Sequence, residues 1–262
     1  MSTEIYYFSG TGNSLHVARE LQKRIPKTNL IPIVSLLNKD IIETNGETVG
    51  FVFPVHFTAI PIPVKNFIKK LDLKSTKYVF AIATRIGTPH SAFKSIGKIL
   101  KKKNKHLDSH FTLNMASNDP KFDYKVPTEE EIKKLESVVH NRLDFIQEII
   151  INKEKNQEKD TNINVPVSSL LVKLVSIIKP FLDFIGIKTH YYADSKCTGC
   201  KICEKVCLSK KIKMINNRPV WQKEVKCFNC YACLNYCPMQ SVQIKSFTEK
   251  NEKILPSICN IR

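Results

Sequence analysis

The sequence predicts an α/β protein with a doubly wound parallel sheet, followed by a smaller α+β domain that is rich in cysteine. Three observations support this prediction. Apolar strand-like runs alternate with helical patterns over the first 151 residues, which is typical of a parallel sheet with helices on both faces. A loop of glycine and hydroxyl residues follows the first of these runs. Eight of the nine cysteines lie between positions 197 and 237, in two copies of one spacing.

The first element is an apolar strand, Ile5–Phe8, followed at once by a polar loop and a helix with apolar residues at helical spacing from Leu15 to Leu21. Such a junction presents backbone N–H groups and the positive end of the helix dipole to an anion. The loop lacks the lysine of a nucleoside triphosphate site, and Leu15 stands where a dinucleotide site needs its third glycine. The loop is therefore expected to hold a phosphate group through hydroxyls and backbone N–H groups. The alternative is that it is an ordinary helix cap.

Further strands and helices follow in alternation. We expect strands at Leu30–Val34, Thr48–Phe53, Tyr78–Thr84 and His106–Met115, and helices at Val64–Leu71, Ser91–Lys103 and Thr128–Ile151. In such sheets, ligands bind beyond the carboxyl ends of the strands. The loops Pro54–Pro61 and Arg85–His90 leave two of those ends, so we expect them to lie near the phosphate.

The loop Ser9–Ser14, between the first strand and the first helix, resembles the phosphate loop by which flavodoxins hold FMN. The Pro54–Pro61 loop is similar to a flavodoxin loop that flanks the isoalloxazine ring. The resemblance implies that FMN is bound, with Phe57 or His56 covering one face of the ring and Arg85 either a surface charge or a partner of the reduced flavin. The expected FMN-binding residues are Ser9, Gly10, Thr11, Gly12, Asn13, Ser14, Pro54, Val55, His56, Phe57, Thr58, Thr84, Arg85 and Gly87.

The cysteine runs have the spacing of a bacterial two-cluster ferredoxin, in which the fourth cysteine of each run ligates the other cluster. One [4Fe-4S] cluster is thus expected on Cys197, Cys200, Cys203 and Cys237, and the second on Cys227, Cys230, Cys233 and Cys207. A zinc site would need only four ligands, and a disulfide framework would need an oxidising compartment. Cys259 is left over, and we expect a free thiol there.

Together these features resemble the EFR-type flavodoxin–ferredoxin fusion proteins of anaerobic bacteria and archaea. The segment from Asn114 to Asn118 is also similar to a short motif of that group. The resemblance implies four parts: a flavodoxin-like FMN domain at 1–151, a linker with amphipathic docking helices at 152–187, a 2[4Fe-4S] ferredoxin-like domain at 188–248, and a tail at 249–262. We expect the polar stretch 152–162 to be mobile and the apolar stretch Leu170–Ile185 to pack the two domains together.

The formal net charge of +17 favours acidic protein redox partners. No nucleic-acid-binding module is recognisable, so we expect no nucleic-acid binding. Charged residues and Pro180 interrupt the one long apolar stretch, so we expect no membrane span. No targeting signal is evident, and we expect a cytoplasmic location. No catalytic residues are predicted. The function expected is electron transfer between the clusters and FMN, as a carrier or adaptor; the alternatives are a flavin-dependent reductase of a small acceptor, which would make the chain an enzyme, and a redox sensor.

Overall fold

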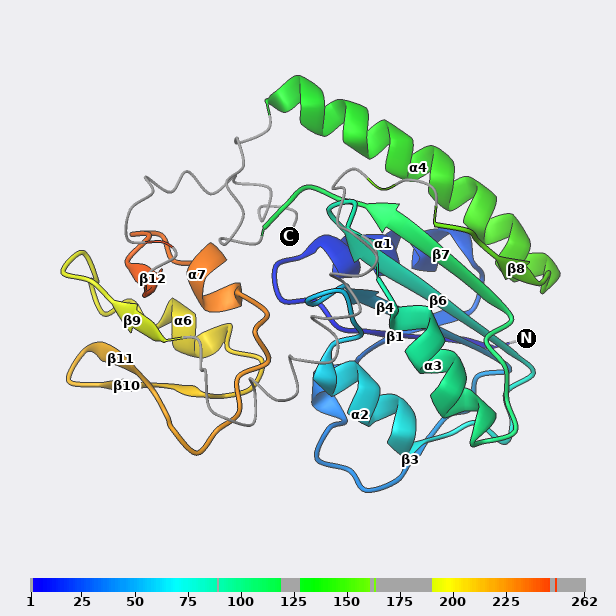
Figure 1. The fold of residues 1–262 in the computed structure, drawn as a ribbon, viewed down its shortest axis with the longest axis horizontal. Coiled ribbons are helices and arrows are strands. Elements are labelled where there is room, and N and C mark those ends of the chain that lie inside the picture. Colours follow the sequence, from blue (N-terminus) through cyan, green and yellow to red (C-terminus); the bar gives the residue numbers. More distant parts are fainter. Residues whose placement is uncertain are drawn as a thin grey trace. The chain divides into compact units, whose positions relative to one another are not determined.

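The computed structural model describes residues 2–88, 90–118, 128–160, 163, 190–245 and 248. The chain divides into two compact units (Figure 1). Within the described residues, the first unit comprises 2–9, 13–116, 129–160 and 163, and the second comprises 10–12, 117–118, 128, 190–245 and 248. Each unit has a hydrophobic core of its own.

A six-stranded parallel sheet forms the centre of the first unit. Its strands stand in the order β2-β1-β4-β6-β7-β8, and all neighbours in it are parallel. The order of the five longer strands is that of the flavodoxin-like doubly wound fold, so the predicted fold class is confirmed. The strands are β1 (Thr3–Tyr7), β2 (Thr28–Pro32), β4 (Thr48–Pro54), β6 (Tyr78–Arg85), β7 (Ser109–Asn114) and β8 (Asn156–Gln157).

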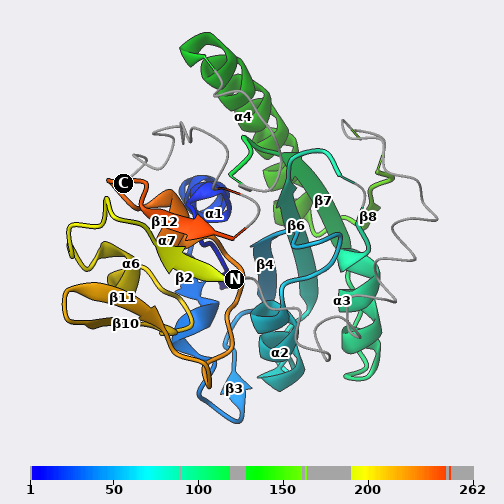
Figure 2. The ribbon, with the colours of Figure 1, turned by 60° about the vertical axis from the view of Figure 1, so that its left-hand side comes forward.

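Helices cover both faces of this sheet (Figures 1 and 2). Leu21 of α1 and Leu143 of α4 share a core with Ile5 and Ile82 on one face. On the other face, the ring of Phe67 in α2 lies 4.8 Å from that of Tyr6. Neighbouring residues of β1 thus face opposite sides of the sheet, as the period of a strand requires. The helices are α1 (Asn13–Arg24), α2 (Ile62–Lys70), α3 (Ala92–Lys101) and α4 (Glu129–Asn152), and η1 (Ile33–Ser35) is a 3₁₀ turn.

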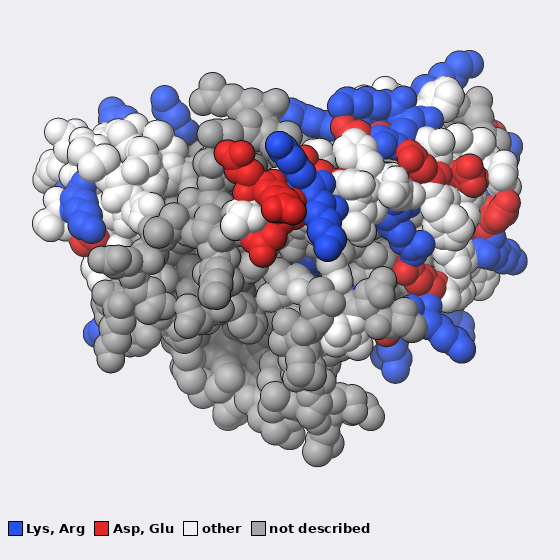
Figure 3. Space-filling view, turned by 90° about the horizontal axis from the view of Figure 1, so that it is seen from above, with Lys and Arg blue, Asp and Glu red and all other residues white. Residues whose placement is uncertain are grey.

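The long helix α4 begins with three acidic residues. Glu129, Glu130 and Glu131 occupy its first turn, where the positive end of the helix dipole favours acidic side chains. Figure 3 shows basic and acidic side chains mixed over the face of the molecule that it displays. None of the helices in the described part of the chain has the length and hydrophobicity that crossing a membrane would require.

Each strand and helix predicted in the first unit is present, with ends displaced by a few residues. Three short strands were not predicted. Two of them, β3 (Ile42–Glu43) and β5 (Leu71–Asp72), pair in parallel with each other outside the main sheet. The prediction of a mobile stretch at 152–162 is wrong for its first part. Asn156 and Gln157 form β8, which pairs with Ser109 and His110 of β7 and so extends the sheet beyond Ile151. The apolar stretch Leu170–Ile185, the tail 249–262 and Cys259 lie outside the described residues.

A glycine allows two central strands to pack closely. Gly50 of β4 stands opposite Phe80 of β6, and a Cβ atom at Gly50 would lie 2.1 Å from the Phe80 ring. Because Phe80 is fully buried, its ring has little room to move aside.

Replacing Gly50 by alanine should therefore lower the free energy of unfolding by about 1 to 3 kcal/mol through overpacking. The matched control is Gly97→Ala in α3, where an added Cβ would have no neighbour within 4 Å. That change should raise the free energy of unfolding by about 0.4 to 1 kcal/mol, since alanine favours the helix. Denaturant unfolding measures both, and a Gly50→Ala protein as stable as the parent would contradict the packing described.

The second unit is built from two similar halves. Each half places a one-turn helix after its second cysteine, and the residue before each helix, Lys201 or Tyr231, has a positive φ of 64° or 56°. Antiparallel pairs join β9 (Tyr191–Ala193) to β12 (Val242–Ile244) and β10 (Ile212–Ile215) to β11 (Arg218–Trp221). The helices are α6 (Ile202–Lys205) and α7 (Ala232–Asn235). These elements confirm an α+β arrangement.

Candidate functional site

The predicted phosphate loop lies between β1 and α1. Gly12 has φ = +110°, a conformation that other residues rarely adopt, so glycine is required there. The helix begins at Asn13 and has no acidic residue in its first turn. The first N–H groups of a helix have no partner within it, so this end of α1 offers donors to an anion.

The side chains of this loop attach it to the ends of neighbouring strands. The Ser14 hydroxyl lies 2.8 Å from that of Thr84 at the end of β6, and both are buried. The Asn13 amide donates to the Ala116 carbonyl at 2.9 Å, and the Asn118 amide donates to the Thr11 hydroxyl. The segment Asn114–Asn118, noted in the sequence, thus contacts the loop. These bonds hold three side chains of the loop in place, and the expectation that the loop side chains donate to a phosphate stays a prediction.

The loop after β4 contains an unusual turn. His56 and Ala59 exchange backbone hydrogen bonds of 3.0 and 2.9 Å, and the two residues between them, Phe57 and Thr58, have φ of 47° and 64°. Two successive positive φ angles are typical of a type I′ turn, and they are uncommon without glycine or asparagine. The Phe57 side chain is exposed, and the buried Thr58 hydroxyl has no hydrogen-bond partner. A buried polar atom of this kind fits a site that a ligand completes.

His56 and the two residues before it complete this loop. The His56 ring lies against that of Phe8, with centroids 5.9 Å apart. Pro54 ends β4, and the N–H of Val55 donates to the Thr84 carbonyl at 2.8 Å. The loops after β1 and β4 therefore both leave the carboxyl edge of the parallel sheet, as predicted.

Arg85 at the end of β6 forms a buried ion pair. Its guanidinium donates two hydrogen bonds of 2.5 Å to the carboxylate of Asp160, and further bonds to Asn114 Oδ1 at 3.0 Å and to the Thr88 carbonyl at 2.7 Å. The Arg85 side chain is 1% exposed and that of Asp160 is 29% exposed. The pair attaches the segment after β8 to the carboxyl edge of the sheet, and the expectation that Arg85 is a surface charge is wrong.

A group of aromatic and histidine rings lies near this ion pair. The Phe93 ring lies 4.9 Å from that of His90 and 4.3 Å from that of His110. Burial, and then the charge of Arg85, lower the pKa of His90 to about 4, so its imidazole is neutral at physiological pH. Gly87, in the same loop, has φ = +102°. His90 lies within the predicted ring-binding loop, but its side chain packs inside the protein.

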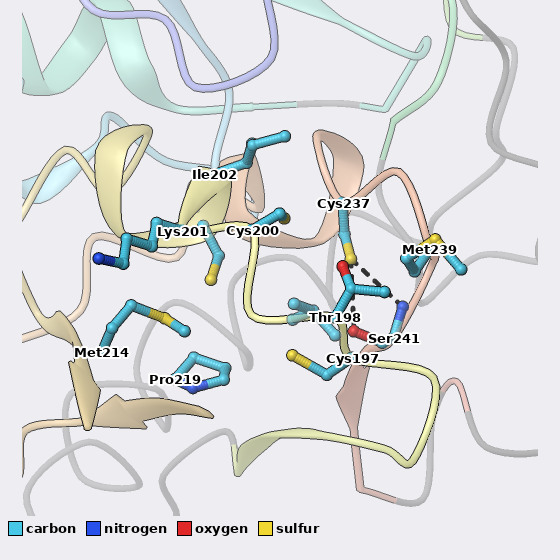
Figure 4. A pocket seen from close by; sticks show the side chains of 12 residues that line it. Cys197, Thr198, Cys200, Lys201, Ile202, Met214, Pro219, Cys237, Met239 and Ser241 are labelled. Atoms are coloured by element: carbon cyan, nitrogen blue, oxygen red, sulfur yellow. Dashed lines mark hydrogen bonds between the residues drawn. The ribbon is translucent and has the colours of Figure 1, made fainter. Parts of the chain in front are cut away.

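In the second unit, four cysteines from both ends of the unit surround one pocket. Cys197, Cys200, Cys203 and Cys237 line it, together with Met214 and Pro219 of the β10–β11 hairpin (Figure 4). Cys237 is further held by Ser241, whose N–H lies 3.3 Å from the sulfur. The pocket is partly open to solvent. This grouping is the one predicted for the first cluster.

The remaining four thiols form the other predicted group. Burial raises the pKa of Cys230 to about 11, and the neighbouring thiolates that raise it further are Cys227 and Cys207. Burial likewise raises the pKa of Cys203, to about 11, but its thiolate neighbours are Cys237, Cys200 and Cys197. Cys207 of the first run is thus a neighbour of Cys230 in the second run, and Cys237 of the second run is a neighbour of Cys203 in the first. Cys203 is also a neighbour of Cys233, so the two groups lie close to each other. Among the described residues, no three or more His, Cys, Asp and Glu side chains are arranged to hold a single metal ion.

No protein-family profile matches the chain, and no curated protein matches it in sequence. Similar solved structures include rubredoxin oxygen:oxidoreductase from Desulfovibrio gigas (14% identity, 57% of this chain and 37% of that chain, TM-score 0.35), a putative flavoprotein from Bacteroides uniformis (15%, 53% and 97%, 0.37) and the two-electron reduced flavodoxin of Megasphaera elsdenii (16%, 53% and 98%, 0.34). The chain thus spans little more than a third of the first of these proteins. The fold assignment rests on the strand order.

Two contributors to the site were not predicted. Asp160 holds Arg85, and Asn118 holds Thr11, and each pair is separated by 75 residues or more in the chain. A lone acidic residue in a polar stretch carries no signal in the sequence, so Asp160 could not have been found. Asn118 ends the segment Asn114–Asn118, which was singled out in the sequence without a function assigned to any of its residues.

Proposed function

We propose that the chain is an electron-transfer protein of the EFR type, with two [4Fe-4S] clusters on the cysteine-rich unit and FMN on the flavodoxin-like unit. The observation that carries this proposal is the pocket lined by Cys197, Cys200, Cys203 and Cys237. Three of these residues come from one run and the fourth comes from the other, which is the crossed arrangement of a two-cluster ferredoxin. A single zinc ion gives no reason for eight cysteines in two such groups.

The thiols of each group would be the cluster ligands. Burial favours the protonated form of a thiol, as the raised pKa values of Cys203 and Cys230 indicate, and a metal reverses this preference by coordinating the thiolate. The Ser241 N–H near Cys237 would help to stabilise the thiolate charge. When bound, the clusters would carry single electrons and the flavin one or two.

The FMN would lie at the carboxyl edge of the parallel sheet. Three features support this position: the N-terminus of α1, the strained turn at Phe57–Thr58 and the buried Thr58 hydroxyl that has no partner. Backbone N–H groups at this end of α1 would contact the phosphate, together with the hydroxyls and the amide of the loop side chains. Eight cysteines that must stay reduced favour the cytoplasm.

Anaerobically purified protein should contain about eight iron and eight acid-labile sulfide per chain, because each cubane cluster contains four of each. It should also bind FMN more tightly than riboflavin, because the phosphate adds charge-assisted hydrogen bonds worth about 1.5 to 3 kcal/mol each. Metal and sulfide analysis and fluorescence titration measure the two. Zinc without sulfide would remove the clusters from the proposal, and equal affinity for FMN and riboflavin would remove the phosphate site.

Electron transfer itself needs a separate measurement. Chemically reduced clusters should reduce the bound flavin at a rate that does not depend on protein concentration, as monitored by rapid-mixing absorbance. A rate proportional to concentration would mean that electrons pass between molecules. If added small acceptors are turned over faster than protein acceptors, the reductase alternative would replace the carrier.

A further inference from the structure

The two groups of cysteines differ in their access to solvent. Cys200 is exposed, whereas the other seven described cysteines are buried or partly buried. The exposed residues Thr198, Cys200, Lys201 and Met239 all line the first pocket, and we call them the pocket mouth. The first group is thus the one with a cysteine exposed to solvent.

The cysteine-rich unit is unusually basic. Residues 190–245 contain ten lysines and arginines but three aspartates and glutamates. Two clusters of about −2 each would leave this segment with a net charge of about +3. The positive charge therefore belongs to the holoprotein as well as to the bare chain.

Besides Lys201, which belongs to the pocket mouth, two more lysines stand within two residues of lining cysteines in the chain. Lys196 precedes Cys197, Lys201 follows Cys200, and Lys205 ends α6, the helix that carries Cys203; all three are exposed. Figure 4 shows the Lys201 side chain extending away from the thiols, so its ammonium is not used within the pocket. Another lysine of the unit, Lys211, has a structural role, because its ammonium donates to the carbonyls of Gln222 and Val225.

The pocket mouth thus combines exposed apolar surface with a basic surround. Met239 is 43% exposed at the mouth, and the nearby hairpin exposes Val220, next to the lining residue Pro219. An apolar centre with a charged rim is the usual composition of a protein interface. Opposite charge on a partner would raise the rate of encounter and orient the partner before contact.

We propose that the pocket mouth, with Lys196, Lys201 and Lys205, is the docking surface for an acidic one-electron carrier protein. This inference rests on the proposed clusters for its chemistry, but on the surface alone for its binding. In the transfer, the reduced carrier loses one electron and the first cluster gains it, so no bond forms or breaks and no proton is needed.

The test is the double variant Lys196→Glu/Lys205→Glu, two exposed lysines that do not line the pocket, with a small acidic bacterial ferredoxin as the probe. The matched control is Lys94→Glu/Lys98→Glu, two exposed lysines of α3 in the other unit, which changes the net charge by the same amount. At low ionic strength we expect the affinity for the ferredoxin, measured by calorimetry, and the rate of its electron transfer to fall at least about tenfold in the first variant. The control should change both by much less, and high salt should reduce the difference because it screens the charges.

Two further readings separate the possible failures. Iron and sulfide contents show whether the clusters are intact. Oxidation of the chemically reduced clusters by a zwitterionic sulfonated viologen, which has no net charge in its oxidised form and accepts one electron, should proceed at equal rates in all three proteins. Ferredoxin affinity that falls equally in both variants would overturn the docking surface in favour of whole-molecule charge, and affinity that changes in neither would overturn it outright. Protein without iron would overturn the proposed clusters, while the calorimetric affinities would still decide the docking surface.

Discussion

Replacement of Asp160 by alanine should lower the free energy of unfolding by about 3 to 5 kcal/mol, because it removes a carboxylate that forms an ion pair with the buried guanidinium of Arg85. The Arg85 side chain is 1% exposed, so water cannot replace the lost carboxylate without a rearrangement. Asn114 Oδ1 and the Thr88 carbonyl would remain as acceptors, but neither carries a charge. Denaturant unfolding of the holoprotein measures the loss.

Two controls separate the buried charge from a general effect of substitution. Glu47→Gln removes a carboxylate whose partner Lys77 is exposed, and it should hardly change the unfolding midpoint, because solvent screens such pairs. The double variant Arg85→Met/Asp160→Leu removes both charges and should recover most of the stability that Asp160→Ala loses. An Asp160→Ala protein as stable as the parent would show that the Arg85–Asp160 pair is not formed in solution.

Replacement of Cys237 by alanine should remove the first cluster, although Cys237 belongs to the second run of the sequence. Cys237 lines the same pocket as Cys197, Cys200 and Cys203, so its loss leaves that cluster with three ligands. Iron should fall from about eight to about four per chain, since one cubane contains four irons.

A second substitution in the same protein tells which cluster has been lost. Adding Cys200→Ala to Cys237→Ala should leave the iron content at about four, because both cysteines serve one cluster. Adding Cys230→Ala instead should reduce it to nearly zero, since the second cluster is then damaged as well. The reverse pattern would show that each run of cysteines holds its own cluster, and the crossed ligation would be wrong.

Local patterns explain why most of the fold could be predicted. The runs at Thr48–Phe53 and Tyr78–Thr84 are apolar because both faces of a central parallel strand are buried. The cysteine spacing predicted which four thiols share a pocket, because a tight loop can bring three of them together but not the fourth.

The features that could not be predicted depend on contacts between distant parts of the chain. The strand Asn156–Gln157 has two polar residues and no alternation, so nothing distinguishes it from a linker. The hydroxyls of Ser14 and Thr84 are 70 residues apart, and no local pattern indicates the hydrogen bond between them. The positive φ angles of Phe57 and Thr58 are likewise unexpected, because neither residue type favours this conformation.

The contact between Gly50 and Phe80 also limits how this sequence can diverge. Because the Phe80 ring occupies the space that a side chain at position 50 would need, the two positions can change together more easily than apart. We expect homologues with a larger residue at position 50 to have a smaller one at position 80. In homologues that keep the phenylalanine, position 50 should remain glycine even where the neighbouring strand residues vary freely among apolar types.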